Sequence, residues 1–113
     1  MADTETDLLR SSLDLLILKA LSWGPLHGYA VAEWIEQSTS GALSLVEGTL
    51  YPALHRLDAK GWAQSEWGVP QSNPKAKFYK PTPAGRARFR AQAPAWHRYA
   101  DAIAAALRAT APA

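Results

Sequence analysis

The spacing of apolar residues changes at Gly61, and this change limits the possible folds more than any other feature of the chain. Before Gly61, apolar residues recur every three or four positions, which is typical of amphipathic helices. Over residues 62–80 they alternate with polar residues in two short runs, as in β-strands. Thr82 followed by Pro83 then marks the start of another helix. The sequence therefore predicts a mainly α-helical protein with one small β-hairpin.

The expected elements follow one another without a linker or an internal repeat. We expect helices over residues 7–22, 26–38, 44–60 and 83–109, a very short extended segment over 43–45, and strands over 62–67 and 76–80. Ser44 with Glu47 three residues later predicts a capping box at the start of the third helix. Pro81 is expected to end the second strand or to lie at a sheet edge, and Pro94 to kink or break the last helix.

Three helices followed by a two-stranded hairpin is the order of a winged helix-turn-helix. In that fold the third helix enters the major groove of DNA, and the hairpin, called the wing, reaches the backbone or the minor groove. We predict that residues 1–82 form this DNA-binding domain and that residues 83–109 form a C-terminal helix for dimerisation. The two parts are expected to make a single compact unit.

The distribution of charge favours the same interpretation. Residues 1–50 contain two basic and seven acidic side chains, whereas residues 51–113 contain ten basic and three acidic ones. This asymmetry indicates one face for a polyanion such as double-stranded DNA. Chance clustering of charge in a small domain is the alternative.

Candidate DNA contacts lie on the third helix and on the wing. A helix N-terminus binds phosphate through its free amides, and hydroxyl, imidazole and guanidinium groups can contact phosphates and base edges. The candidates are Ser44, Gly48, Thr49, Tyr51, Pro52, His55, Arg56, Lys75 and Lys77. Alternatives stay open for three side chains: Tyr51 can instead pack under the wing, Arg56 can be an ordinary solvated residue, and Glu47 is either a helix cap or a reader of cytosine.

The last helix has an apolar seam of its own. Its apolar and small residues are spaced by four and three in alternation, as at the a and d positions of a coiled coil: Phe89, Ala93, Trp96, Ala100, Ile103 and Leu107. A long terminal helix with such a seam requires another helix to pack against, which predicts a homodimer.

Several other functions are excluded at this level. The chain has no cysteine, and its three histidines fall in three different expected elements, so neither a metal site nor a cofactor is expected. Motifs for a catalytic serine, a phosphate loop or paired carboxylates are missing, so an enzyme is not expected. Residues 1–7 do not resemble a signal peptide, and charges interrupt the apolar stretch 8–23. We therefore expect a cytoplasmic protein without a membrane partner.

Three motifs in the expected order resemble the PadR family of bacterial transcriptional regulators. Residues 47–57 read EGTLYPALHRL, residues 24–29 read GPLHGY, and KFY at 77–79 is followed by TPAGR at 82–86. Pro81 departs from the family, which usually has leucine there. The resemblance implies a homodimeric winged-helix repressor that binds a palindromic operator and dimerises through its C-terminal helix. The length of the chain implies a short member with one terminal helix.

The resemblance also implies a possible effector. Short members of the family can hold flat aromatic drugs in an apolar chamber at the dimer interface. Its walls here would be Leu8, Leu9, Ser12, Phe89 and Trp96. The alternative is a plain dimer core in which Trp96 fills the space left by neighbouring alanines. For the whole chain, the alternatives to a DNA-binding regulator are a winged-helix protein-interaction module and a small-molecule sensor that does not bind DNA.

Overall fold

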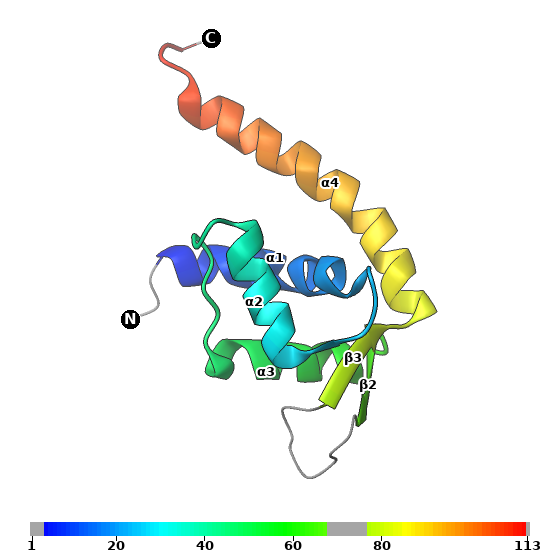
Figure 1. Ribbon diagram of the computed structural model, residues 1–113. Coiled ribbons are helices and arrows are strands. Elements are labelled where there is room, and N and C mark those ends of the chain that lie inside the picture. The colour runs from blue at the N-terminus through cyan, green and yellow to red at the C-terminus, as the bar shows by residue number, and fades with distance from the viewer. Residues whose placement is uncertain (1–3, 68–76, 113) are drawn as a thin grey trace.

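A computed structural model of the chain describes residues 4–67 and 77–112, with side chains of the first helix described from residue 12 onward. The elements are α1 (Thr4–Leu21), β1 (Leu26–His27), α2 (Gly28–Ser38), α3 (Glu47–Ala59), β2 (Ala63–Trp67), β3 (Lys77–Pro81) and α4 (Pro83–Arg108). The prediction of a winged helix-turn-helix with a long C-terminal helix is confirmed (Figure 1).

The core lies where α1, α2 and α3 meet. Each helix contributes side chains from its inner face, and the largest that are fully buried are Ile17, Leu21, Val31, Ile35, Leu50, Leu54 and Leu57. Burying one such side chain contributes roughly 1.5–3 kcal/mol to stability. The helical spacing of apolar residues therefore produces the three-helix body that presents α3.

The sheet contains a strand that the sequence did not predict. The strand order is β1-β3-β2, with both pairs antiparallel. Leu26 pairs with Tyr79 and His27 with Phe78, so α2 begins at Gly28 and not at Leu26. Two residues are too few to show an alternating pattern, and this strand exists only because β3 offers it a partner.

The capping box predicted at Ser44 is wrong. The N-cap of α3 is Val46, and no side chain caps it by a hydrogen bond. The Ser44 hydroxyl instead lies 3.5 Å from Glu36 Oε1 on α2, to which it donates. The segment 43–46 runs as irregular backbone between the two helices, and its path places Ser44 two residues too early to cap α3.

The base of the wing is tied to the start of α4 through Thr82. Its hydroxyl donates to the Gly61 carbonyl at 2.6 Å and accepts from the Gly85 amide at 3.0 Å, while its own amide donates to the Trp62 carbonyl at 3.1 Å. β3 ends at Pro81, as the sequence predicts. Gly85 lies so close to Trp62 that a Cβ atom would come within 1.9 Å of the Trp62 carbonyl oxygen.

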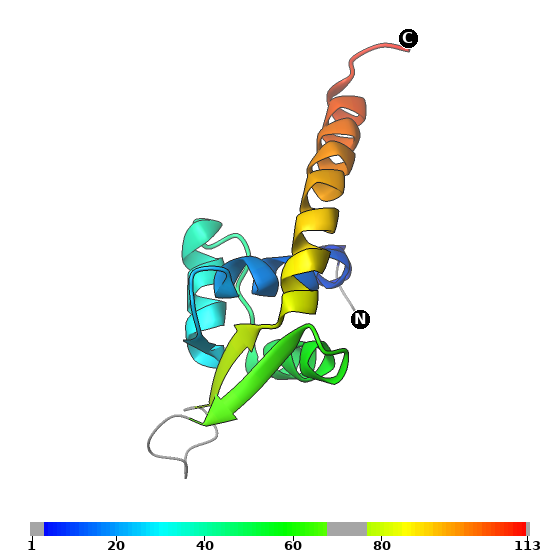
Figure 2. The ribbon, with the colours of Figure 1, turned by 90° about the vertical axis from the view of Figure 1, so that its right-hand side faces the viewer.

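The break expected at Pro94 is absent, because α4 runs without interruption from Pro83 to Arg108. Pro94 is exposed, so water can solvate the carbonyl that loses its helical partner. The C-terminal half of α4 extends away from the body (Figures 1 and 2). In the described part of the chain, none of the helices combines the length and apolarity needed to cross a bilayer.

Candidate nucleic-acid interface

One side of α3 is buried and the other is open. The buried side carries Leu50, Ala53, Leu54 and Leu57. Of the predicted contacts, Gly48, Pro52, His55 and Arg56 are exposed, and Thr49 and Tyr51 are half-buried. Ser44 lies before α3 and is exposed. The helix therefore presents most of the predicted residues on a continuous accessible side.

Gly48 is unusual among the glycines of the helices. A Cβ atom at Gly28 would come within 2.8 Å of Tyr51 Cε1, and one at Gly85 would strike the Trp62 backbone. A Cβ atom at Gly48 would meet nothing within 4 Å, and Gly48 does not have a positive φ. Glycine in a helix costs roughly 0.5–1 kcal/mol relative to alanine. Nothing within the described residues compensates for that cost at Gly48.

Tyr51 packs its ring over the first residue of α2. Gly28 leaves the space that this ring occupies, and Leu54 fills the remainder beneath it. The tyrosine is half-buried, so its ring supports the corner between α2 and α3 while part of it stays accessible. Tyr51 also lies near Tyr79 of β3, so packing against the start of α2 does not exclude the packing under the wing that we considered.

Arg56 has a partner inside the protein. Its Nη2 atom lies 2.9 Å from Oδ1 of Asp14 on α1, and both side chains remain partly exposed. The ion pair ties α3 to α1 and orients the guanidinium group. Exposed pairs of this kind contribute only about 0.2–1 kcal/mol.

The wing carries two lysines that differ in their surroundings. The Lys77 ammonium lies 5.0 Å from the centre of the Trp67 ring, whereas that of Lys80 lies 3.7 Å from Oε2 of Glu66. Lys75 was also predicted to contact DNA, but it lies outside the described residues. Trp67 was not among the predicted contacts, and its only sequence signal is an aromatic residue at the outer end of an expected strand.

The sheet contacts α3 through a serine hydrogen bond and a buried tyrosine. Ser65 donates to Asp58 Oδ2 at 3.0 Å. Tyr79 is buried, and burial, followed by the nearby Asp58 and Tyr51, raises the pKa of its hydroxyl from its ordinary value. Burial and the nearby groups thus favour the neutral form of Tyr79 beside α3.

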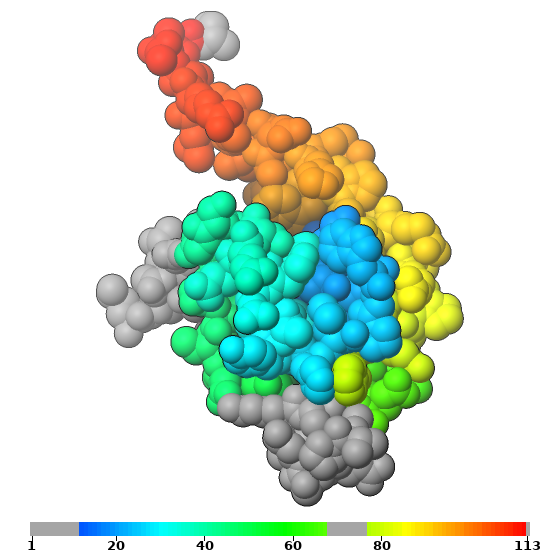
Figure 3. Space-filling view, in the orientation of Figure 1, coloured from blue at the N-terminus to red at the C-terminus, as the bar shows by residue number. Residues whose placement is uncertain are grey.

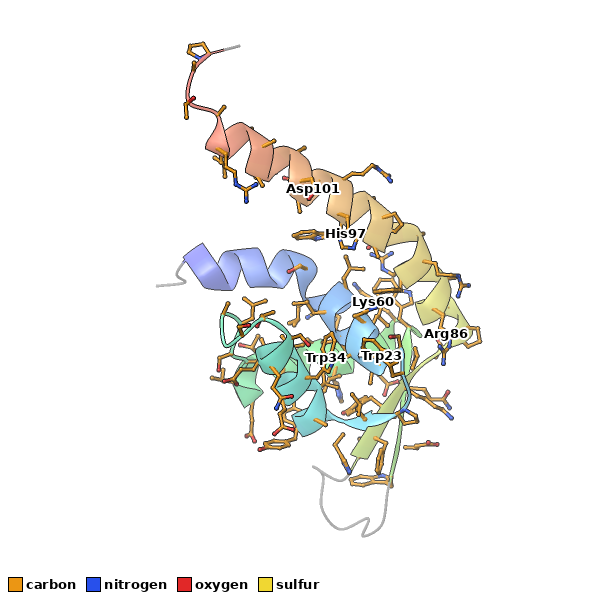
Figure 4. The ribbon with its side chains drawn as sticks, turned by 45° about the horizontal axis from the view of Figure 1, so that its top comes forward. Trp23, Trp34, Lys60, Arg86, His97 and Asp101 are labelled. Atoms are coloured by element: carbon orange, nitrogen blue, oxygen red, sulfur yellow. The ribbon has the colours of Figure 1, made fainter. Side chains whose placement is uncertain are left out.

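Trp62 connects the end of α3 to α4. Its ring lies 4.7 Å from the Lys60 ammonium and 3.9 Å from the Arg88 guanidinium carbon. A second aromatic group lies at the surface, where the rings of Trp23 and Trp34 are 5.5 Å apart (Figure 4). The pairings of Trp62 with Arg88 and of Trp23 with Trp34 join separate segments of the chain, so local sequence patterns gave no sign of them.

The first half of the predicted α4 seam faces α1 across a groove of about 380 Å³. The groove is lined by Ser12, Leu15, Leu16 and Lys19 of α1, by Leu43, and by Phe89, Ala93, Trp96 and His97 of α4. Figure 4 shows His97 on the part of α4 that passes over α1. Leu8 and Leu9 belong to α1, but their side chains lie outside the described part of the chain.

The second half of the seam is largely exposed to solvent. Ile103 is 43 % and Leu107 is 80 % exposed, while Ala100 is half-covered. Tyr99, which is not on the predicted seam, is also exposed. This end of α4 stands clear of the body in the space-filling view (Figure 3).

The three histidines remain separate, in β1, α3 and α4. Among the residues that the structure describes, no three His, Asp or Glu side chains lie close enough to hold a metal ion.

Comparison with known proteins gives consistent matches. The transcriptional regulator Rv3488 of Mycobacterium tuberculosis is 38 % identical over 79 residues, which cover 69 % of each chain. A PadR family transcriptional regulator from Eggerthella lenta is 30 % identical, with a TM-score of 0.73 over 92 % of this chain and 88 % of that one. Bacillus subtilis PadR, solved in complex with operator DNA, shares the fold at 21 % identity, with a TM-score of 0.60 over 89 % of this chain and 48 % of that one.

The family itself matches most of the chain. The PadR-like family of transcriptional regulators matches residues 17–91, which include α2, α3, both strands of the wing and the start of α4. The protein is therefore a member of the PadR-like family of transcriptional regulators.

Proposed function

We propose that the protein is a repressor that binds a near-palindromic operator as a homodimer, with α3 in the major groove and the wing against the DNA backbone. The observation that carries this proposal is the open N-terminal end of α3, where a Cβ atom at Gly48, next to Thr49, would meet no described atom within 4 Å. A glycine that the fold does not require lets a phosphate approach the helix amides closely. Bacillus subtilis PadR, which shares the fold, has been solved with operator DNA.

Residues 1–82 supply DNA binding in this proposal, and residues 83–109 supply dimerisation. The 26 residues of α4 span about 39 Å. The apolar side chains on its outer half, among them Ile103 and Leu107, are exposed on the isolated chain. Packing against α4 of a second copy would cover them, and the two copies of α3 would then lie about 34 Å apart, one turn of DNA.

Operator binding can be tested on duplex DNA selected for affinity from a random pool. We expect Lys77→Ala to make the plot of log affinity against log salt less steep by about two. This change corresponds to the loss of one phosphate contact from each subunit of the dimer. Lys80→Ala is the matched control, because Lys80 lies on the same strand but is paired with Glu66, and we expect it to leave the slope unchanged. Sedimentation of the free protein should give a dimer.

Two results would contradict the proposal. A monomer that binds no DNA at low salt would favour a protein-interaction module or a sensor without DNA activity. Equal slopes for the wild type and both lysine variants would remove the wing from the contact surface.

The groove between α1 and α4 favours a response to an aromatic effector. Apolar side chains form most of its lining, with Phe89 and Trp96 on one wall and Lys19 on the other. In this proposal a ligand seated there changes how α4 sits on the body, and with it the spacing of the two recognition helices. It can change operator affinity only by its differential affinity for the two arrangements.

The effector site can be tested with the aromatic dye anilinonaphthalene sulfonate, whose fluorescence rises in an apolar environment. We expect Trp96→Ala to weaken dye binding roughly 2- to 10-fold, the range for loss of one aromatic contact. Trp23→Ala is the control, because Trp23 is exposed and is not part of the groove. Equal binding by the wild type and Trp96→Ala would leave the groove as part of a plain dimer core.

A further inference from the structure

Trp67 and Lys77 form a pair at the outer end of the described wing. They lie directly opposite each other in the register of β2 and β3, and the Lys77 ammonium is 5.0 Å from the centre of the indole ring. Trp67 is 45 % exposed, which leaves much of the ring open to solvent. The ring therefore limits the positions that the ammonium can take without enclosing it.

The pair lies on the face of the sheet that packs against α3. Side chains of a strand alternate between faces, so Trp67 shares a face with Ser65, and Lys77 shares one with Tyr79. Ser65 bonds to Asp58 of α3, and Tyr79 is buried in the core that includes α3. Lys77 is thus on the side of the wing that α3 occupies.

The other lysine of β3 has a different environment. Lys80 points to the opposite face by the same alternation, and its ammonium lies 3.7 Å from the Glu66 carboxylate. A lysine that is neutralised by a carboxylate contributes less to the binding of a phosphate than one held by an aromatic ring, which leaves its charge intact. Of the two wing lysines that the structure describes, Lys77 therefore keeps its charge available and Lys80 is paired with a carboxylate.

We propose that Trp67 is a positioning residue for DNA binding, which holds the Lys77 ammonium at the α3 side of the wing so that it meets a backbone phosphate. This inference rests on the proposed function. The indole face occupies one side of the ammonium group and leaves its remaining N–H donors for the phosphate oxygens. The long lysine stem then loses less conformational freedom when DNA binds than it would on a bare strand.

The size of the effect follows from the strength of the contact. A cation–π interaction at an exposed site corresponds to about a 2- to 5-fold change in an equilibrium constant. A dimer that uses both wings would lose about 5- to 30-fold in affinity without the ring. The charge of Lys77 is unchanged when the ring is removed. The number of phosphate contacts, and therefore the dependence of log affinity on log salt, should stay the same.

The experiment is a double-mutant cycle on the full-length protein with DNA selected from a random pool, measured across a range of salt concentrations. We expect Trp67→Ala to weaken binding about 5- to 30-fold without changing the salt slope, and to have no effect when Lys77→Ala is already present. Trp67→Phe keeps an aromatic face and should retain most of the affinity. Circular dichroism of each variant checks that the fold is kept.

Four results would overturn the assignment. If Trp67→Ala lowered DNA affinity equally in the wild type and in Lys77→Ala, Trp67 would act independently of the lysine. A loss in Trp67→Phe as large as in Trp67→Ala would exclude the aromatic face as the cause, and tighter binding by Trp67→Ala would mean that the ammonium leaves the ring when DNA binds. A wild-type protein that binds no DNA would overturn the proposed function as well, which separates the two failures.

Discussion

Gly48→Ala is expected to make the folded protein more stable and its complex with DNA weaker. Gly48 is the second residue of α3, and an added methyl group would meet nothing within 4 Å. Replacing a helical glycine with alanine restricts the unfolded chain and stabilises the folded one by about 0.4–1 kcal/mol. Urea or thermal unfolding should therefore show a small increase in the free energy of unfolding.

The effect on DNA binding should be opposite in sign and larger. In the proposed complex a phosphate approaches the backbone amides at the start of α3, and a methyl group would hold it away. Hydrogen bonds to a charged group contribute about 1.5–3 kcal/mol, so losing even one of them would weaken binding about 10-fold or more. Affinity and stability should be measured on the same preparation, because a gain in one with a loss in the other cannot come from misfolding. Unchanged affinity would place the N-terminus of α3 outside the DNA contact.

Gly85→Ala is expected to destabilise the protein severely. The new Cβ atom would lie 1.9 Å from the carbonyl oxygen of Trp62 and 2.8 Å from its carbonyl carbon. These are backbone atoms that cannot rotate away, and the Trp62 carbonyl also accepts the Thr82 amide. Relief of the clash requires α4 to move off the base of the wing, and we expect a loss of about 3 kcal/mol or more in the free energy of unfolding.

The matched control for Gly85→Ala is Ala84→Gly, one residue earlier on the same turn. Ala84 is exposed, so this change should cost only about 0.5–1 kcal/mol, through the conformational freedom of glycine. Thermal unfolding of both variants makes the comparison. A Gly85→Ala protein as stable as Ala84→Gly would show that α4 does not approach Trp62 as closely as the structure indicates.

Local patterns in the sequence were enough to predict most of the fold. Helical spacing places α1 to α4 within a few residues of their ends, because each helix buries one face and therefore repeats its apolar residues. Alternation gives β2 and β3, and Pro81 ends β3 as expected. Two local signals did not have the expected effect, the serine cap of α3 and the break at Pro94. Ser44 does not cap α3, and Pro94 does not interrupt α4.

The exposure of most candidate DNA contacts on α3 was also predicted, because residues opposite a buried stripe must face outward. The residues that these side chains contact within the protein were not predicted. Arg56 is paired with Asp14, which lies 42 positions away in the chain, and the strand formed by Leu26 and His27 depends on β3. The cation–π pair of Trp67 and Lys77 requires the register of the hairpin. The first two contacts join segments that are distant in sequence, and the third depends on which residues of the hairpin face each other, so no local pattern specifies any of them.

Two glycines show most clearly what the sequence determined and what only the tertiary structure decided. The sequence by itself determined that Gly48 and Gly85 both fall early in a helix, where they look alike. Only the tertiary structure distinguished them, since Gly85 lies against the backbone of Trp62 and Gly48 faces open space. The physical reason is that a position requires glycine only where atoms from elsewhere come too close to leave room for a side chain. At Gly85 the chain itself makes that approach, and at Gly48 we propose that DNA does.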